Sequence, residues 1–309
     1  MDCFVATEMA PRNDGVMLVG LAIVKFCYSV YFTLLSTYFR IFFLKIKGLH
    51  PILYNINNNI FMGFLMVDYT KTFTATQKTY DAGLREYMLK VYNYMALALV
   101  LTGVTALATI SFEPLARLLF QIGPNGQFMG NTGLGTLVMI SPVGIALYFF
   151  MGFGKMSLDT TKVLFWVYAA LTGMSLASLG LIYTGESIAR TFFICSSVFG
   201  AMSLYGYSTN RDLTSMGSFV VMGLFGLLIV SLVNLFLQSS AIYFATSLIG
   251  VAVFMGLIAW DTQKIKSMYF MSGGGELGQK MSIMAAFSLY LDFINLFLYL
   301  LRFFGNRRN

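Results

Sequence analysis

Residues 282–304 read Ser-Ile-Met-Ala-Ala-Phe-Ser-Leu-Tyr-Leu-Asp-Phe-Ile-Asn-Leu-Phe-Leu-Tyr-Leu-Leu-Arg-Phe-Phe, with one carboxylate, Asp292, near the middle. A membrane span needs roughly 20 apolar residues, so this stretch is long enough to cross a bilayer as a helix. Asp292 lies roughly 15 Å along that helix, close to the middle of the bilayer. Because an ionisable group is costly at that depth, Asp292 is a candidate functional residue.

The composition of the whole chain supports a membrane protein. Of its 309 residues, 58% are hydrophobic and only 11% are charged. A soluble domain averages about 25% charged residues, so this chain lacks the polar surface that a water-exposed globule requires. Membrane lipid is therefore the first partner that the sequence predicts.

The same length criterion predicts seven spans from residue 91 onward, and hence an all-α integral membrane protein. The predicted spans are 91–110, 133–153, 163–183, 188–207, 217–237, 242–260 and 282–304. Gly-rich and polar residues mark the two longest predicted connections, 111–132 and 261–281. Pro142 lies inside the second span, where we expect neighbouring helices to satisfy the carbonyl that it frees.

Basic residues are distributed unevenly between the two sides of the predicted bundle. Ten of them fall on the side of the lead-in 66–90, against four on the other, so we expect the lead-in to be cytoplasmic and the C-terminus outside. The ten are Lys71, Lys78, Arg85, Lys90, Lys155, Lys162, Arg211, Lys264, Lys266 and Lys280.

Residues 1–65 form an N-terminal extension of a different character from the predicted membrane domain, 66–309. Residues 16–39 are apolar enough to span once, but Lys25 interrupts them. The alternatives are an eighth span, a signal-anchor, or upstream sequence translated from a mis-set start, with the natural start near Met66. The pattern fits a cleaved signal peptide poorly, because no basic segment precedes the apolar stretch.

The final predicted helix carries polar side chains along one face. Ser288, Asp292, Asn295, Tyr299 and Arg302 are spaced by four, three, four and three residues. Such a stripe faces either a polar path through the bundle or a hydrogen-bonded seam with another helix. Since a seam needs Ser and Asn but no carboxylate, the stripe favours a functional role.

Asp261 ends the sixth predicted span and has two interpretations. By position alone it is an aspartate at a helix end, facing water beside Lys264 and Lys266. If the sixth helix continues past Trp260, however, Asp261 meets Asp292 on the adjacent antiparallel helix. Two such carboxylates cannot both ionise cheaply in a poor dielectric, so they would share a proton and sense pH.

Two cations are available to favour the ionised pair of aspartates. Lys155 lies at the inner end of the second span, and Arg302 lies on the last one. Lys155 can equally be an ordinary lysine of the positive-inside pattern.

The sequence gives little support to an enzyme, a cofactor or a nucleic-acid partner. His50 is the only histidine, and the three cysteines are scattered. The aspartates lack the Tyr-Asp and Gly-x-Gly-Asp motifs of intramembrane aspartyl proteases. The net charge of +7 comes from residues at the ends of apolar runs, without the exposed aromatic residues of a nucleic-acid surface.

Three segments resemble the Bax inhibitor-1 (transmembrane Bax-inhibitor-motif) family. The run Ser288–Gly305 is similar to that family's last helix, and Gly256–Ile265, with Trp260-Asp261, to its sixth. The lead-in Tyr80–Tyr94 resembles that of bacterial members. The resemblance covers about residues 75–305 and leaves residues 1–65 outside it.

This resemblance implies a seven-helix bundle with the last helix enclosed, in a bacterial inner membrane. It also implies a pH-sensitive calcium leak in which Asp261 and Asp292 form the pH-sensing pair. Lys155 stands where a bacterial member has a latch arginine, although lysine cannot make the bidentate contact of arginine with carboxylates. The second span also has no acidic residue to partner Arg302.

Calcium normally takes six to eight oxygen ligands, which two aspartates, Asn295 and hydroxyls cannot supply. We therefore expect calcium to pass Asp261 and Asp292 transiently as a permeant ion, alongside protons. The resemblance also allows an alternative function, because the family includes members assigned to regulating a quality-control protease or the stress and cell-death machinery.

Overall fold

The computed structural model describes residues 77–123, 128–272 and 275–308. Within these ranges it contains seven helices that are long and apolar enough to cross a membrane, which confirms the predicted fold class. The alternatives for residues 1–65, and the placement of residues 66–76, concern parts of the chain outside the described ranges.

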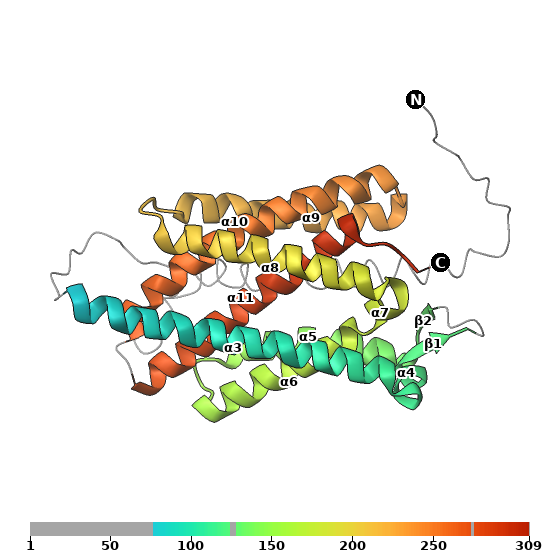
Figure 1. The fold of residues 1–309 in the computed structure, drawn as a ribbon, viewed down its shortest axis with the longest axis horizontal. Helices are drawn as coiled ribbons and strands as arrows, with labels where there is room; N and C mark the ends of the chain where they lie inside the picture. The colour runs from blue at the N-terminus through green and yellow to red at the C-terminus, as the bar shows by residue number, and fades with distance from the viewer. Residues whose placement is uncertain (1–76, 124–127, 273–274, 309) are drawn as a thin grey trace, which may run out of the picture.

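The spanning helices follow one another along the chain as an antiparallel bundle (Figure 1). They are α3 (Gln77–Ser111), α5 (Gly133–Gly152), α6 (Leu158–Leu176), α8 (Gly185–Ser208), α9 (Thr214–Leu237), α10 (Ser240–Ser272) and α11 (Gly275–Phe304). The short helix α7 (Ser178–Ile182) completes the third span.

The last helix, α11, is the core of the bundle. Every residue from Met281 to Leu301 is buried, although this helix is as apolar as those around it. It packs against α10, α3, α8 and α6, and Figure 1 shows it running obliquely between them. The structure therefore confirms that the last helix is central.

The predicted connection 261–281 is wrong over most of its length, because α10 continues to Ser272 and α11 begins at Gly275. The polar end of α10 finds partners in the α8–α9 connection. The Gln263 side chain donates to the Arg211 carbonyl at 2.7 Å and accepts from the Leu213 amide at 2.8 Å. Hydropathy alone places the end of a span at the first cluster of polar residues. It cannot show that hydrogen-bond partners for those residues lie on a neighbouring segment.

The predicted connection 111–132 also holds regular structure. It contains α4 (Glu113–Leu119) and an antiparallel hairpin of β1 (Phe120–Ile122) and β2 (Phe128–Asn131). Thr132 then caps α5 by accepting from the Gly135 amide at 3.0 Å.

Pro142 lies within α5, as the sequence indicates, but its own helix supplies the compensating contact. Proline cannot donate to the carbonyl four residues earlier, which here belongs to Val138. The Ser141 hydroxyl donates to that carbonyl at 2.9 Å. The expectation that a neighbouring helix satisfies this carbonyl is therefore corrected to a local serine.

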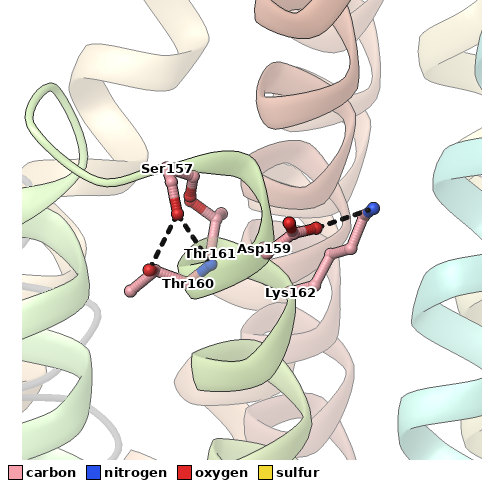
Figure 2. A network of polar contacts seen from close by, with 5 residues as sticks. All are labelled: Ser157, Asp159, Thr160, Thr161 and Lys162. Atoms are coloured by element: carbon pink, nitrogen blue, oxygen red, sulfur yellow. Dashed lines mark hydrogen bonds and ion pairs between the residues drawn. The ribbon is translucent and has the colours of Figure 1, made fainter.

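The third span begins earlier than predicted, at Leu158, because Ser157 caps α6. The Ser157 hydroxyl accepts a hydrogen bond from the Thr160 amide at 3.2 Å, drawn as a dashed line in Figure 2. On the next turn, the ammonium of Lys162 lies 3.5 Å from the exposed carboxylate of Asp159. Such a contact at a surface contributes little stability, so the cap rather than the ion pair fixes this helix start.

The segment after α11 is tied to the connection between α7 and α8. The Thr184 amide donates to the Asn306 carbonyl at 3.1 Å, and the Arg308 amide donates to the Ile182 carbonyl at 2.9 Å. The Asn306 amide also donates to the Ser187 hydroxyl at 2.9 Å. These bonds fix the end of the central helix relative to α8.

Candidate functional site

Asp261 lies inside α10 rather than at its end, and its side chain is 3% exposed. This corrects the interpretation of Asp261 as a helix-end residue facing water. The Ser288 hydroxyl of α11 donates to Asp261 Oδ2 at 2.5 Å. Asp261 therefore faces the central helix, as the pairing interpretation requires.

Asp292 is 1% exposed and lies one helical turn beyond Ser288 on α11. Side chains four residues apart on a helix are neighbours, with Cβ atoms about 5–6 Å apart. Because Ser288 contacts Asp261 directly, the structure brings the two aspartates to the same part of the α10–α11 interface. We call Asp261, Ser288 and Asp292 the acidic site.

Two further residues of the polar stripe, Tyr299 and Arg302, contact α10. The Tyr299 ring lies 5.6 Å from the Phe254 ring, measured between centroids, and the Arg302 guanidinium lies 5.6 Å from the centre of the Tyr243 ring. Asn295 is buried and donates to the Leu291 carbonyl of its own helix at 2.8 Å. The stripe therefore contacts α10 at Ser288, Tyr299 and Arg302, whereas Asn295 is hydrogen-bonded within α11.

Two glycines bring neighbouring helices unusually close to this interface. A Cβ on Gly250 would lie 2.5 Å from the Tyr299 ring, and one on Gly206 of α8 would lie 2.2 Å from the Ala259 carbonyl of α10. Only glycine permits such backbone approach without displacement. Sequence reasoning missed Gly206, because a single glycine in an apolar helix carries no signal of which helix it contacts.

A chain of hydroxyls next to the acidic site was also missed. The Tyr92 hydroxyl bonds to the Ser203 hydroxyl, which lies 3.1 Å from the Thr262 hydroxyl. These residues come from α3, α8 and α10, so the chain joins three helices beside Asp261. Its members are far apart in sequence, and the only sequence signal that could have indicated this contact is that each side chain carries a hydroxyl.

Lys155 lies exposed in the turn after α5, whereas both aspartates are buried. In the same turn, the Met156 carbonyl accepts a hydrogen bond at 2.6 Å from Lys280, a residue of α11. The central helix is thereby linked to the turn that carries Lys155. The role of Lys155 as a counter-ion for the aspartates stays a prediction.

The described residues contain no group of three or more His, Cys, Asp and Glu side chains arranged to hold a metal ion. The acidic site offers two carboxylates and one hydroxyl. Its chemical capacity is to bind and release protons and to offer a few oxygen ligands to a passing cation.

Comparisons with known proteins agree with this architecture. A family model described as "Inhibitor of apoptosis-promoting Bax1" matches residues 84–309, which include both aspartates and all of α11. An uncharacterised protein of Rickettsia prowazekii is 72% identical over 246 residues, covering 79% of this chain and 100% of the relative. Escherichia coli inner membrane protein YbhL is 44% identical over 229 residues, covering 74% of this chain and 94% of YbhL. A Caulobacter vibrioides protein is 44% identical over 229 residues, covering 74% of this chain and 91% of the relative.

Proposed function

The chain belongs to the Bax inhibitor-1 family and is an integral bacterial inner membrane protein, and from this premise we propose that it is a pH-sensitive, calcium-permeable leak channel. In this proposal, protonation of the acidic site controls the path along the α10–α11 interface. The observation that supports the proposal is that Asp261 and Asp292 are both buried and that Ser288, one turn from Asp292, donates to Asp261 across the contact between α11 and α10.

Electrostatics supports a proton-sharing pair at this position. Two unit charges in a poor dielectric repel strongly, and burial separately penalises each charged form. The Ser288 hydroxyl offsets part of that cost for an ionised Asp261, because it donates to the carboxylate. Asp292, one turn away, then adds its charge only at a higher free-energy cost.

The proposed gating step follows from this contact. While Asp261 is ionised, the Ser288 hydroxyl holds α10 against α11 with a charge-assisted hydrogen bond. Protonation weakens that bond and removes the charge, so the two helices can separate at this level. In this proposal Lys155 is the cation that favours the ionised state of the aspartates. It lies in the turn after α5, which the hydrogen bond from Lys280 to the Met156 carbonyl links to α11.

The oxygen atoms of the acidic site match transient calcium passage better than storage. Two carboxylates and a hydroxyl fall short of the six to eight oxygens of a tight calcium site, so water must complete the shell. An ion held by so few protein ligands can leave as readily as it enters, which permeation requires.

The test is calcium efflux from liposomes that contain only the purified full-length protein, measured with an internal calcium-sensitive dye across pH. We expect the wild-type leak to change with pH and the Asp292→Asn variant to lose that dependence. Asp159→Asn is the matched control, because Asp159 is a carboxylate exposed at the start of α6.

Equal leaks from wild type and Asp292→Asn at every pH would refute gating by the acidic site. A wild-type protein that conducts no calcium at any pH would refute the channel itself. The second result would favour the alternative regulatory role that the family resemblance allows. Pull-down of partner proteins from native membranes would then test that role.

A further inference from the structure

A second polar cluster contacts the central helix on the side away from the acidic site. It consists of four hydroxyl-bearing residues from α3, α6 and α11, which we call the hydroxyl cluster: Thr102, Tyr168, Thr172 and Tyr290. Each is at most 5% exposed, and none carries a charge at neutral pH. Tyr290 lies between Ser288 and Asp292 in sequence, so the cluster and the acidic site flank α11 at the same depth.

The hydrogen bonds on the α3 side of the cluster can be assigned by counting donors. The Thr102 oxygen lies 2.8 Å from the Tyr290 hydroxyl and 2.9 Å from the carbonyls of Ala98 and Ala169. Thr102 has a single hydrogen to donate. The carbonyls cannot donate, so Tyr290 donates to Thr102, and Thr102 donates to the carbonyls. The Tyr290 oxygen then keeps a lone pair that can accept another hydrogen bond.

The hydroxyls on the α6 side have no such partners. Tyr168 and Thr172 are fully buried, and neither hydroxyl has a partner of normal hydrogen-bond geometry in the described ranges, although the Thr172 hydroxyl lies close enough to those of Tyr168 and Tyr290 to interact with both. They lie one turn apart on α6, beside Tyr290, whose ring centroid is 5.9 Å from that of Tyr168. Buried hydroxyls without partners are rare in native proteins, and each such group calls for an explanation.

We propose that one internal water molecule binds between α6 and α11 in the hydroxyl cluster. Its oxygen accepts from the hydroxyls of Tyr168 and Thr172, and one of its hydrogens donates to the free lone pair of Tyr290. Three polar partners are the usual number for a buried water. The assignment leaves each hydroxyl of the cluster with a partner, and it does not depend on the proposed channel function.

The chemistry of the cluster favours water over a cation. A buried ion needs an opposite charge or a full set of ligands to offset its desolvation, and the cluster offers only neutral hydroxyls. Aromatic rings surround the site, with Phe287 4.7 Å from Tyr168 and Phe165 6.4 Å from Tyr290 between ring centroids. These rings separate the water from lipid and from bulk solvent.

The test is X-ray radiolytic hydroxyl labelling of the purified full-length protein, read by mass spectrometry. Radicals form from bound water in place, so buried side chains beside it are labelled although bulk solvent cannot reach them. We expect Tyr168 and Tyr290 to be labelled several-fold faster than Phe254, which is equally buried and lies outside the cluster. Labelling of both tyrosines at the rate of Phe254 would overturn the proposal.

Two matched variants separate a bound water from a merely reactive phenol. Thr172→Val preserves side-chain shape but removes one ligand, so labelling at Tyr168 and Tyr290 should fall. Thr172→Ser keeps the hydroxyl and should retain it. Thr191→Val removes a buried hydroxyl on α8 that also lacks a partner in the described structure, and should change neither rate. Equal labelling in Thr172→Val and wild type would also contradict the proposal, and the wild-type rates decide the question if a variant fails to fold.

Discussion

The central helix presents two buried polar regions that differ in one respect. Toward α10 it places Ser288 against the carboxylate of Asp261, with Asp292 one turn further along, while toward α3 and α6 it places Tyr290 among neutral hydroxyls and aromatic rings. Both regions are buried at the same depth of the bundle. Only the first contains carboxylates, so the proposed pH response belongs to that region, and burial and polarity do not by themselves identify a pH-sensitive site. The comparison predicts that stability and pH response can be altered separately, by substitutions on opposite sides of one helix.

The largest effect on stability is expected on the α6 side, from Phe287→Ala. Phe287 is fully buried and its ring lies 4.7 Å from the rings of both Phe149 and Tyr168. Removing a buried aromatic side chain costs about 3–5 kcal/mol in the free energy of unfolding. Denaturant unfolding in detergent micelles measures this loss. The pH at half-maximal leak should stay at the wild-type value, and a shift would show that the two regions are coupled.

Ser288→Ala is expected to cost less but to change the pH response. It removes the hydroxyl that donates to Asp261, a bond to a charged group worth about 1.5–3 kcal/mol. Because this bond favours the ionised carboxylate, its loss favours protonation, and the leak should open at a higher pH than in wild type. Liposome efflux across pH measures the shift. Ser288→Thr, which keeps a hydroxyl, serves as the control, and an unshifted Ser288→Ala response would remove Ser288 from the gate.

Tyr290→Phe removes a hydroxyl at the same depth of α11 as Ser288, but on the face turned toward α3 and α6. The variant loses the bond between the Tyr290 and Thr102 hydroxyls, so we expect destabilisation of about 0.5–1.5 kcal/mol. No charged group is involved, so the pH at half-maximal leak should not move. The same unfolding and efflux measurements apply, and an altered pH response here would break the distinction between the two regions.

The smallest effect is expected at Asp212, a carboxylate outside the spans. Its oxygen accepts from the Thr214 hydroxyl at 2.6 Å and from the Thr214 amide at 2.9 Å, which lowers the pKa of this carboxyl below its usual value. A lowered folded-state pKa gives stability that is present above the unfolded pKa and is lost as pH falls through the folded one. Asp212→Asn should therefore cost no more than about 0.5 kcal/mol at neutral pH.

The thermal unfolding midpoints of wild type and Asp212→Asn check this sign. Their small difference should begin to shrink near pH 4, about the usual carboxyl pKa, and should disappear only when the pH falls through the lowered folded-state pKa of Asp212. A difference that grows as pH falls would contradict the assignment.

Much of the fold could be predicted from the sequence, because spans of apolar residues are local features. The seven spans follow from length and hydropathy, and the central place of α11 followed from the family resemblance. The end of α10 could not be located in this way. Asp261 and Gln263 look like a helix end in the sequence, yet Gln263 is satisfied by the α8–α9 connection and Asp261 by α11. Such partners are tertiary contacts, which hydropathy does not encode.

The candidate site was predictable to a similar extent. The spacing from Ser288 to Arg302 correctly predicted that these side chains share one helix face, because helical periodicity is fixed. That Ser288, Tyr299 and Arg302 contact α10, and that Gly206 brings α8 onto the same helix, depends on how the helices pack. The hydroxyl cluster was missed for the same reason, since Thr102 and Tyr290 are distant in sequence and carry no charge to mark them.

The pairing of the chain end with the α7–α8 connection has a practical consequence for experiments on this protein. The backbone from Gly305 to Arg308 holds the last turn of α11 against Ile182 and Thr184, so it acts as an anchor for the central helix. We expect an affinity tag or fluorescent reporter fused directly after residue 309 to strain these backbone hydrogen bonds and so to disturb the central helix. A flexible Gly/Ser spacer long enough to leave the anchor unstrained is therefore the appropriate design for purification, topology mapping and the liposome assays described above.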